Sequence, residues 1–162
     1  MDSRIELLGP DSPLLDTVVA WHWREWSHGY DDPDRDTWRA NVNGRTRRDG
    51  VPFTLIAHLD SEPVAEPVAE PVGCVSVCDD DGDARFPDRG PWLSGMLVLG
   101  HARNLGVGRA LVGRAEDLAR NLGVRELWVA TTEAGRFYAR CGWVDVVPKE
   151  GLHGRAVMCR TL

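Results

Sequence analysis

Apolar positions in the first third of the chain recur at helical spacing. Between residues 11 and 26 they fall every three or four positions, behind Ser12 and Pro13, a pair suited to the cap and first turn of a helix. A weaker pattern of the same period covers residues 34–48 and stops before Gly50. The N-terminal third is therefore predicted to form two helices.

The rest of the chain alternates short apolar runs with amphipathic stretches. Residues 107–122 place their apolar side chains on one stripe and end before Gly123, and a second, short helix is predicted over 134–141. Strand, helix, strand and helix in succession indicate an α/β fold in which helices flank a mixed β-sheet. The runs predicted as strands are 53–57, 73–78, 92–99, 127–130, 143–147 and 156–160.

A four-residue unit occurs three times in succession between the first two predicted strands. Residues 62–73 read Glu-Pro-Val-Ala, Glu-Pro-Val-Ala and Glu-Pro-Val-Gly. Proline has no N–H to donate to a β-ladder, so a period of four with proline in every copy does not suit a strand. We interpret all of 62–73 as a repeat-expanded hairpin loop, which is either an extended tip without function or a contact for a partner.

Length and composition narrow the class of protein. A chain of 162 residues suits one domain, so residues 1–162 are predicted to fold as a single unit. Hydrophobic residues at 43% and charged residues at 27% exclude a disordered or collagen-like chain. No apolar run is long enough to span a bilayer, and the N-terminus leads into no secretory segment, so we expect no membrane partner.

The four cysteines and one acidic loop are candidates for disulfide or metal sites. The cysteines lack the spacing of a disulfide scaffold or a zinc site, and we interpret them as reduced thiols, which predicts a cytoplasmic location. The acidic run 79–83 resembles a calcium loop only superficially, because the glutamate that such a loop carries at its twelfth position is missing. No metal is therefore expected.

Charge is distributed unevenly along the chain. The net charge of −6 makes nucleic acid an improbable partner, because neutralising phosphates needs a surplus of Lys and Arg. Residues 1–90 carry 19 acidic and 9 basic side chains, whereas residues 91–162 carry 6 and 10. The second half could hold an anion and the first could attract a cation, although solvated charge with no partner gives the same distribution.

A glycine-bearing loop follows the predicted strand 92–99 and opens the helix 107–122. Glycines let the backbone approach a ligand closely, and the free amides at a helix start favour an anion such as a pyrophosphate. A dinucleotide fingerprint would need a glycine where Leu111 stands, and a Walker loop would need Gly-Lys-Ser/Thr. The loop is thus a phosphate cradle that matches neither of these nucleotide motifs.

The Arg-x-x-Gly-x-Gly pattern at 103–108 resembles the acyl-CoA loop of the GNAT superfamily of N-acetyltransferases. A second segment, 137–143, is similar to that superfamily's Phe-Tyr-x-x-x-Gly-aromatic motif and follows the next strand, as the family requires. The resemblance covers about 91–144 and is only architectural over 1–90. It implies one N-acetyltransferase domain of GNAT type, with a central mixed β-sheet flanked by helices and two central strands that splay apart.

The resemblance implies acetyl-CoA as co-substrate and assigns residues to it. Leu97, Val98 and Leu99 are expected to contact pantetheine through their backbone. A side chain at either glycine of the loop would obstruct the phosphates, although a loop that needs positive φ without any ligand is the alternative. The residues assigned to the pyrophosphate are Arg103, Asn104, Leu105, Gly106, Val107, Gly108 and Arg109.

Acetyl transfer to an amine needs a neutral nucleophile, a polarised carbonyl and a proton for the departing thiolate. Tyr138 matches the family's tyrosine that often protonates the sulfur, although it could instead be a buried residue that packs on the sheet. The residues 92–98 contain no acid, which departs from many relatives and leaves the general base open. Glu133 is the candidate base, with His101 and the acidic stretch 79–81 as alternatives, and with helix capping as its other interpretation.

Tryptophans gather on the two N-terminal helices, which in the family border the acceptor groove. Trp26 and Trp38 are predicted to contact the acceptor, although tryptophans at helical spacing, Trp21 and Trp23 included, are also typical core anchors. The resemblance implies direct attack by a primary amine of a small molecule or peptide in a ternary complex. A non-catalytic acyl-CoA-binding sensor or partner-binding module is the alternative, and the family allows a homodimer. A lone histidine such as His22 is interpreted as a core or surface residue.

Overall fold

The protein is described by a computed structural model over residues 3–60, 69–79, 82–150 and 154–162. The strands are β1 Ser3–Leu7, β2 Phe53–Asp60, β3 Ala69–Cys78, β4 Trp92–Val98, β5 Glu126–Thr131, β6 Val144–Val147 and β7 Ala156–Thr161. The helices are α1 Leu15–Trp26, α2 Arg35–Gly44, α3 Val107–Asn121 and α4 Gly135–Arg140, with 3-10 turns η1 Ser27–Gly29 and η2 Gly100–Ala102.

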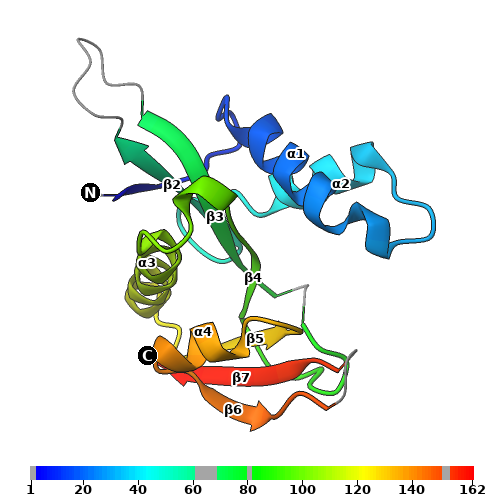
Figure 1. Cartoon of the computed structure of the whole chain (residues 1–162), viewed down its shortest axis with the longest axis vertical. Helices are drawn as coiled ribbons and strands as arrows, with labels where there is room; N and C mark the ends of the chain where they lie inside the picture. Colours follow the sequence, from blue (N-terminus) through cyan, green and yellow to red (C-terminus); the bar gives the residue numbers. More distant parts are fainter. Residues whose placement is uncertain (1–2, 61–68, 80–81, 151–153) are drawn as a thin grey trace.

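The strands form one mixed sheet of seven, in the order β1-β2-β3-β4-β5-β7-β6. Neighbours are antiparallel except β4 and β5, which run parallel and share a single register pair, Trp92 with Trp128. Beyond this pair the two strands separate, and the half formed by β5, β6 and β7 turns away from β1 to β4 (Figure 1). The predicted mixed sheet with splayed central strands is confirmed.

Helices cover both faces of the β1–β4 half (Figure 1). One face packs on α3 through residues such as Leu111 and Ala115, and the other packs on α1 through Val18 and Trp21. Alternation along β2 explains this division, because Leu55 belongs to the α3 side and its neighbour Ile56 to the α1 side. Each helix thus buries one apolar stripe on a sheet that is apolar on both faces.

A β-bulge interrupts β4 at Gly95. The β3–β4 register passes from Ser76 opposite Ser94 to Cys74 opposite Leu97, so β4 carries an extra residue, and Gly95 takes φ +57°. A strict period of two would put Leu93 and Leu97 on the same face, but Leu93 packs with the α3 cluster and Leu97 with the α1 cluster. The bulge therefore lets β4 contribute to both cores.

Part of the repeat segment is a β-strand. Residues 61–68 lie outside the described part of the chain, but β3 begins at Ala69, so the prediction that all of 62–73 is loop is wrong for 69–73. Proline is tolerated there because Pro71 pairs with His58 next to a register shift, where the ladder is already irregular.

One strand and two helix boundaries also differ from the sequence predictions. β1, at residues 3–7, was not predicted, and it pairs antiparallel with β2. α1 begins at Leu15 because the preceding Ser12–Leu14 segment forms a turn in which Ser12 Oγ accepts a hydrogen bond from the Leu14 amide at 3.2 Å. α2 ends at Gly44, several residues before the predicted end.

Candidate active site

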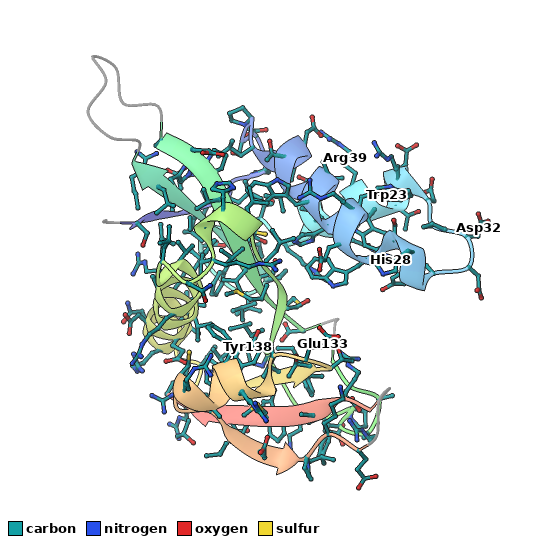
Figure 2. The ribbon with its side chains drawn as sticks, viewed as in Figure 1. Trp23, His28, Asp32, Arg39, Glu133 and Tyr138 are labelled. Carbon is teal, nitrogen blue, oxygen red and sulfur yellow. The ribbon has the colours of Figure 1, made fainter. Side chains whose placement is uncertain are left out.

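A single groove brings together most of the residues singled out from the sequence. Its volume is about 1320 Å³, and it runs from α1, η1 and α2 along β4 to the α3 loop and to the end of β5 with α4. Figure 2 shows Tyr138 and Glu133 at the β5–α4 end and His28 and Asp32 at the α1–α2 end. The predicted residues that line it are Trp26, Trp38, Leu97, Val98, Arg103, Asn104, Gly106, Gly108, Arg109, Glu133 and Tyr138.

Three predicted cofactor residues are not among those that line the groove. The Leu99 amide donates to Val72 O at 2.8 Å, so this N–H is already engaged with β3. The Leu105 side chain is 48% exposed, and the Val107 side chain is buried in the α3 core. For Leu105 and Val107, any part in binding would fall to the backbone amide, as expected for a helix start.

The loop before α3 has the geometry of an anion cradle. Asn104 and Gly106 take φ +63° and +85°, and Gly106 is the residue that caps α3. A Cβ at Gly106 would meet no protein atom within 4 Å, so the space in front of the helix start is open. At Gly108 a Cβ would lie 3.2 Å from Met96 Cε and 3.3 Å from Phe137 Cζ, so this glycine also lets α3 pack closely on its neighbours.

Arginines surround the cradle. Arg103 and Arg109 both line the groove and are exposed, and Arg103 Nε donates to the Val98 carbonyl at 3.0 Å. This bond joins the last residue of β4 to the loop, so the side chain also helps to fix the loop. The described residues therefore provide open backbone at a helix start and positive charge beside it, which fit a pyrophosphate-bearing cofactor.

Tyr138 lies on α4, is 3% exposed and borders the groove. Its ring meets Phe137 and Trp143 with centroid separations of 5.1 and 5.5 Å. Burial, and to a lesser degree Cys141, raises the pKa of the Tyr138 hydroxyl well above its usual value near 10. The hydroxyl therefore stays protonated at any physiological pH and is available as a hydrogen-bond donor. Tyr138 does pack in the core, as one interpretation of the sequence has it, and its role toward the sulfur stays a prediction.

The candidate bases are separated by the fold. Glu133 is exposed and lines the groove just beyond the end of β5, before the Ala134 that begins α4. The capping contact there comes from Thr131, whose hydroxyl accepts from the Ala134 amide at 3.0 Å. His101 Nε2 lies 3.6 Å from Glu70 Oε1, on the β3 side, and is not among the lining residues. Residues 80–81 lie outside the described part of the chain.

The tryptophans divide between the core and the groove. Trp21 is buried in the α1 core, whereas Trp26 and Trp38 are half-buried and border the groove. Trp38 meets Trp23 and the exposed Tyr30 edge-on, with centroid separations of 5.7 and 5.2 Å. Trp26, Tyr30 and Trp38 line the end of the groove away from α4, and Trp23 contacts Trp38.

Several residues that border the groove are not among those predicted from the sequence, including Tyr30, Arg45 and Ser94. His22, interpreted from the sequence as a core or surface residue, also borders it. Arg45 Nη1 donates to Ser94 Oγ at 3.3 Å, which joins the end of α2 to β4. The spacing of His22 four residues before Trp26 was the available signal, because it puts both on one face of α1.

The acetyltransferase (GNAT) family matches residues 15–143, which is most of the chain. This chain belongs to that family. A GNAT relative, an uncharacterised N-acetyltransferase of Chlorobaculum tepidum, is 29% identical over 92 residues. The matched stretch is 57% of this chain and 55% of that protein, so the chain spans about half the length of the curated relative it matches.

Solved structures share the fold of this GNAT member. An aminoglycoside 6′-N-acetyltransferase complexed with coenzyme A has a TM-score of 0.70 at 16% identity, over 98% of this chain and 96% of that one. Arabidopsis thaliana NAA60 in complex with acetyl-CoA has a TM-score of 0.67 at 14% identity, over 99% of both chains. At these identities the likeness establishes the GNAT fold. Among the described residues, no helix is both long and apolar enough to cross a membrane.

Proposed function

We propose that this GNAT-family protein moves an acetyl group from acetyl-CoA to a primary amine by direct attack in a ternary complex. One observation carries the proposal: a single groove joins the separated edge of β4, the open helix start of α3 and the protonated hydroxyl of Tyr138. These are the parts that binding and cleaving a thioester on a phosphate-bearing carrier require. The family membership and the coenzyme A ligands of the two structural relatives support it.

The residues at the α3 end would hold the cofactor. The amides of the loop and first turn of α3, with Arg103 and Arg109, suit the pyrophosphate. The backbone of Leu97 and Val98 lies where β4 has left β5, and suits the amides of pantetheine. When bound, acetyl-CoA supplies the activated acetyl group and a thiolate leaving group.

Tyr138 would donate a hydrogen bond to the departing sulfur. Because its hydroxyl keeps its proton, it can donate a hydrogen bond to negative charge that develops on the sulfur. Burial strengthens such a bond, since little water competes for the donor. Glu133, on the same end of the groove, remains our proposal for a base that acts through water.

The acceptor would enter from the α1–α2 end. Trp26 and Trp38 present apolar and aromatic surface there, next to the carboxylates of Glu25 and Asp32. Aromatic faces and carboxylates both attract an ammonium group, which agrees with the acidic excess of residues 1–90. A small-molecule or peptide amine is therefore the proposed partner.

Thiol release from acetyl-CoA, measured across polyamines, aminoglycosides, amino acids and peptides, tests the proposal. We expect release above the no-amine rate with at least one class. Tyr138→Phe should lower kcat by about 10²-fold or more and leave the affinity for coenzyme A unchanged. Tyr30→Phe is the matched control, because Tyr30 borders the same groove but is 63% exposed and lies at the far end.

The outcome separates the enzyme from the sensor. Binding of coenzyme A without turnover of any amine would favour the non-catalytic acyl-CoA-binding module and would overturn the proposed transferase. Equal losses in Tyr138→Phe and Tyr30→Phe would remove Tyr138 from the mechanism. The single domain over 1–162, the cytoplasmic location and the homodimer stay predictions.

A further inference from the structure

The groove ends where β4 and β5 meet. The two strands share one register pair, Trp92 with Trp128, and neither tryptophan is among the residues that line the groove. The residue that follows each of them, Leu93 on β4 and Val129 on β5, does line it. Both are only 3% exposed, so the groove stops on these two side chains. We call this end of the groove, defined by Leu93 and Val129, the apex.

The apex is apolar on the side of the sheet that packs on α3. Leu93 and Val129 both belong to the α3 core, together with Tyr138. The next side chain along β4, Ser94, takes the opposite face, where its Oγ accepts a hydrogen bond at 3.3 Å from Nη1 of the Arg45 that follows α2. A ligand at this end of the groove therefore meets hydrocarbon on the α3 side and polar groups on the α1–α2 side.

The order of the sites along β4 sets the direction of a bound thioester. The phosphate cradle follows the end of β4, and Leu97 and Val98, the residues proposed to contact pantetheine, come shortly before it. A cofactor that is held at both places runs back along β4, so its sulfur lies nearer the apex than its phosphates do. The acyl group that the sulfur carries then comes closest to Leu93 and Val129.

We propose that Leu93 and Val129 select a short acyl group, so that the enzyme favours acetyl over longer acyl chains. This inference rests on the proposed function, because the direction of the thioester follows from the cofactor site proposed there. Protein interiors are close-packed, so each further CH2 of an acyl chain at the apex would have to displace a core side chain. One methylene too many in an apolar pocket changes kcat/KM by a factor of about 10–200.

Rates and affinities of the wild type test this selection. The value of kcat/KM is measured for acetyl-, propionyl-, butyryl- and hexanoyl-CoA, with the amine that gives the fastest thiol release. The affinity for the same thioesters, measured by calorimetry without any amine, is a readout that does not need turnover. We expect both quantities to fall along the series, with kcat/KM for butyryl-CoA about 10-fold or more below that for acetyl-CoA.

Truncation of either apex residue should relax the selection. We expect Val129→Ala and Leu93→Ala each to lower the ratio of kcat/KM for acetyl-CoA to that for butyryl-CoA by about 10-fold or more, because the freed space admits the longer chain. Val112→Ala and Leu127→Ala are the matched controls, since both residues are buried in the same α3 core and neither is among those that line the groove. A loss of stability lowers the rates with both thioesters alike, so the controls should leave the ratio unchanged.

The outcomes separate this inference from the proposed function. A wild type that uses butyryl-CoA as well as acetyl-CoA would overturn the selection and leave the transferase standing. An unchanged ratio in both apex variants, or an equal change in the two controls, would do the same. Thioester affinities that fall along the series in the wild type and level out in Val129→Ala would support the apex even in a protein that acetylates no amine, a result that would refute the transferase alone.

Discussion

Replacing Glu116 by alanine probes the contact that ties α3 to the segment that follows Tyr138. Glu116, on α3, is 8% exposed, and its Oε1 accepts a hydrogen bond from Trp143 Nε1 at 2.8 Å. Its Oε2 lies 3.7 Å from Arg160 Nε, on β7. Since the Trp143 ring packs on Tyr138, one carboxylate joins α3, the end of α4 and β7.

The structure sets the size of the effect. Alanine leaves the buried indole N–H of Trp143 without an acceptor, which costs about 1–3 kcal/mol. Loss of the ion pair with Arg160 adds at most about 1 kcal/mol, because that guanidinium is 36% exposed. We expect the free energy of unfolding to fall by about 1–4 kcal/mol, which corresponds to a drop in Tm of roughly 2–16 °C for a chain of this length.

Urea denaturation followed by tryptophan fluorescence measures this loss, with an unchanged m-value as the sign that both variants unfold alike. Glu116→Gln is the control, because its amide oxygen can still accept a hydrogen bond from the indole. Its free energy of unfolding should fall by less than half as much as that of Glu116→Ala. A Glu116→Ala variant within about 0.5 kcal/mol of the wild type, or a glutamine variant that is equally destabilised, would refute the reasoning.

Three further predictions concern the loop before α3, the stability of the protein at acid pH, and the binding of the amine. Gly106→Val should cost about 1–2 kcal/mol at φ +85° and weaken coenzyme A binding in a titration, while Gly113→Ala, in open space on α3, should raise Tm. Hydrogen bonds from Arg85 lower the pKa of Asp83 to about 2. These hydrogen bonds stabilise the folded protein above pH 4, and their contribution should be lost as the pH falls from about 4 to 2. The free energy of unfolding, measured across this pH range, should show this loss in the wild type and not in Asp83→Asn. Trp38→Ala should raise the KM for the amine and leave coenzyme A affinity unchanged.

Local patterns predict most elements of the fold, but β1 and the first residues of β3 are not among them. The sequence does carry a signal for β1, because Ile5 and Leu7 alternate with Arg4 and Glu6, the period-two pattern of a half-buried strand. Pro71 argues locally against a strand, but a register shift next to its partner His58 accommodates it. That shift depends on pairing with β2, which local sequence does not contain.

The sequence predicts the residues at the α3 end of the groove better than those at the α1–α2 end. The α3 loop is one contiguous segment whose glycines and following helix imply a cradle, so its residues were found together. The α1–α2 end depends on which face of α1 turns toward β4. His22 shows the difficulty, since its neighbours Cys74 and Gly95 are distant in sequence and meet it only through the packing of α1 on the sheet.

The single register pair between β4 and β5 has a consequence for cooperativity. Among the described residues, main-chain bonding between the two halves of the sheet is confined to the region of Trp92 and Trp128, so the sheet itself couples the halves weakly. Side-chain packing in the α3 core and the contacts of Glu116 with Trp143 and Arg160 hold the halves together instead. A ligand that contacted β4 and α3 on one half and α4 on the other would add a link that the sheet lacks, and hydrogen exchange in both halves should then slow together. Such a ligand would act as part of the protein's own architecture.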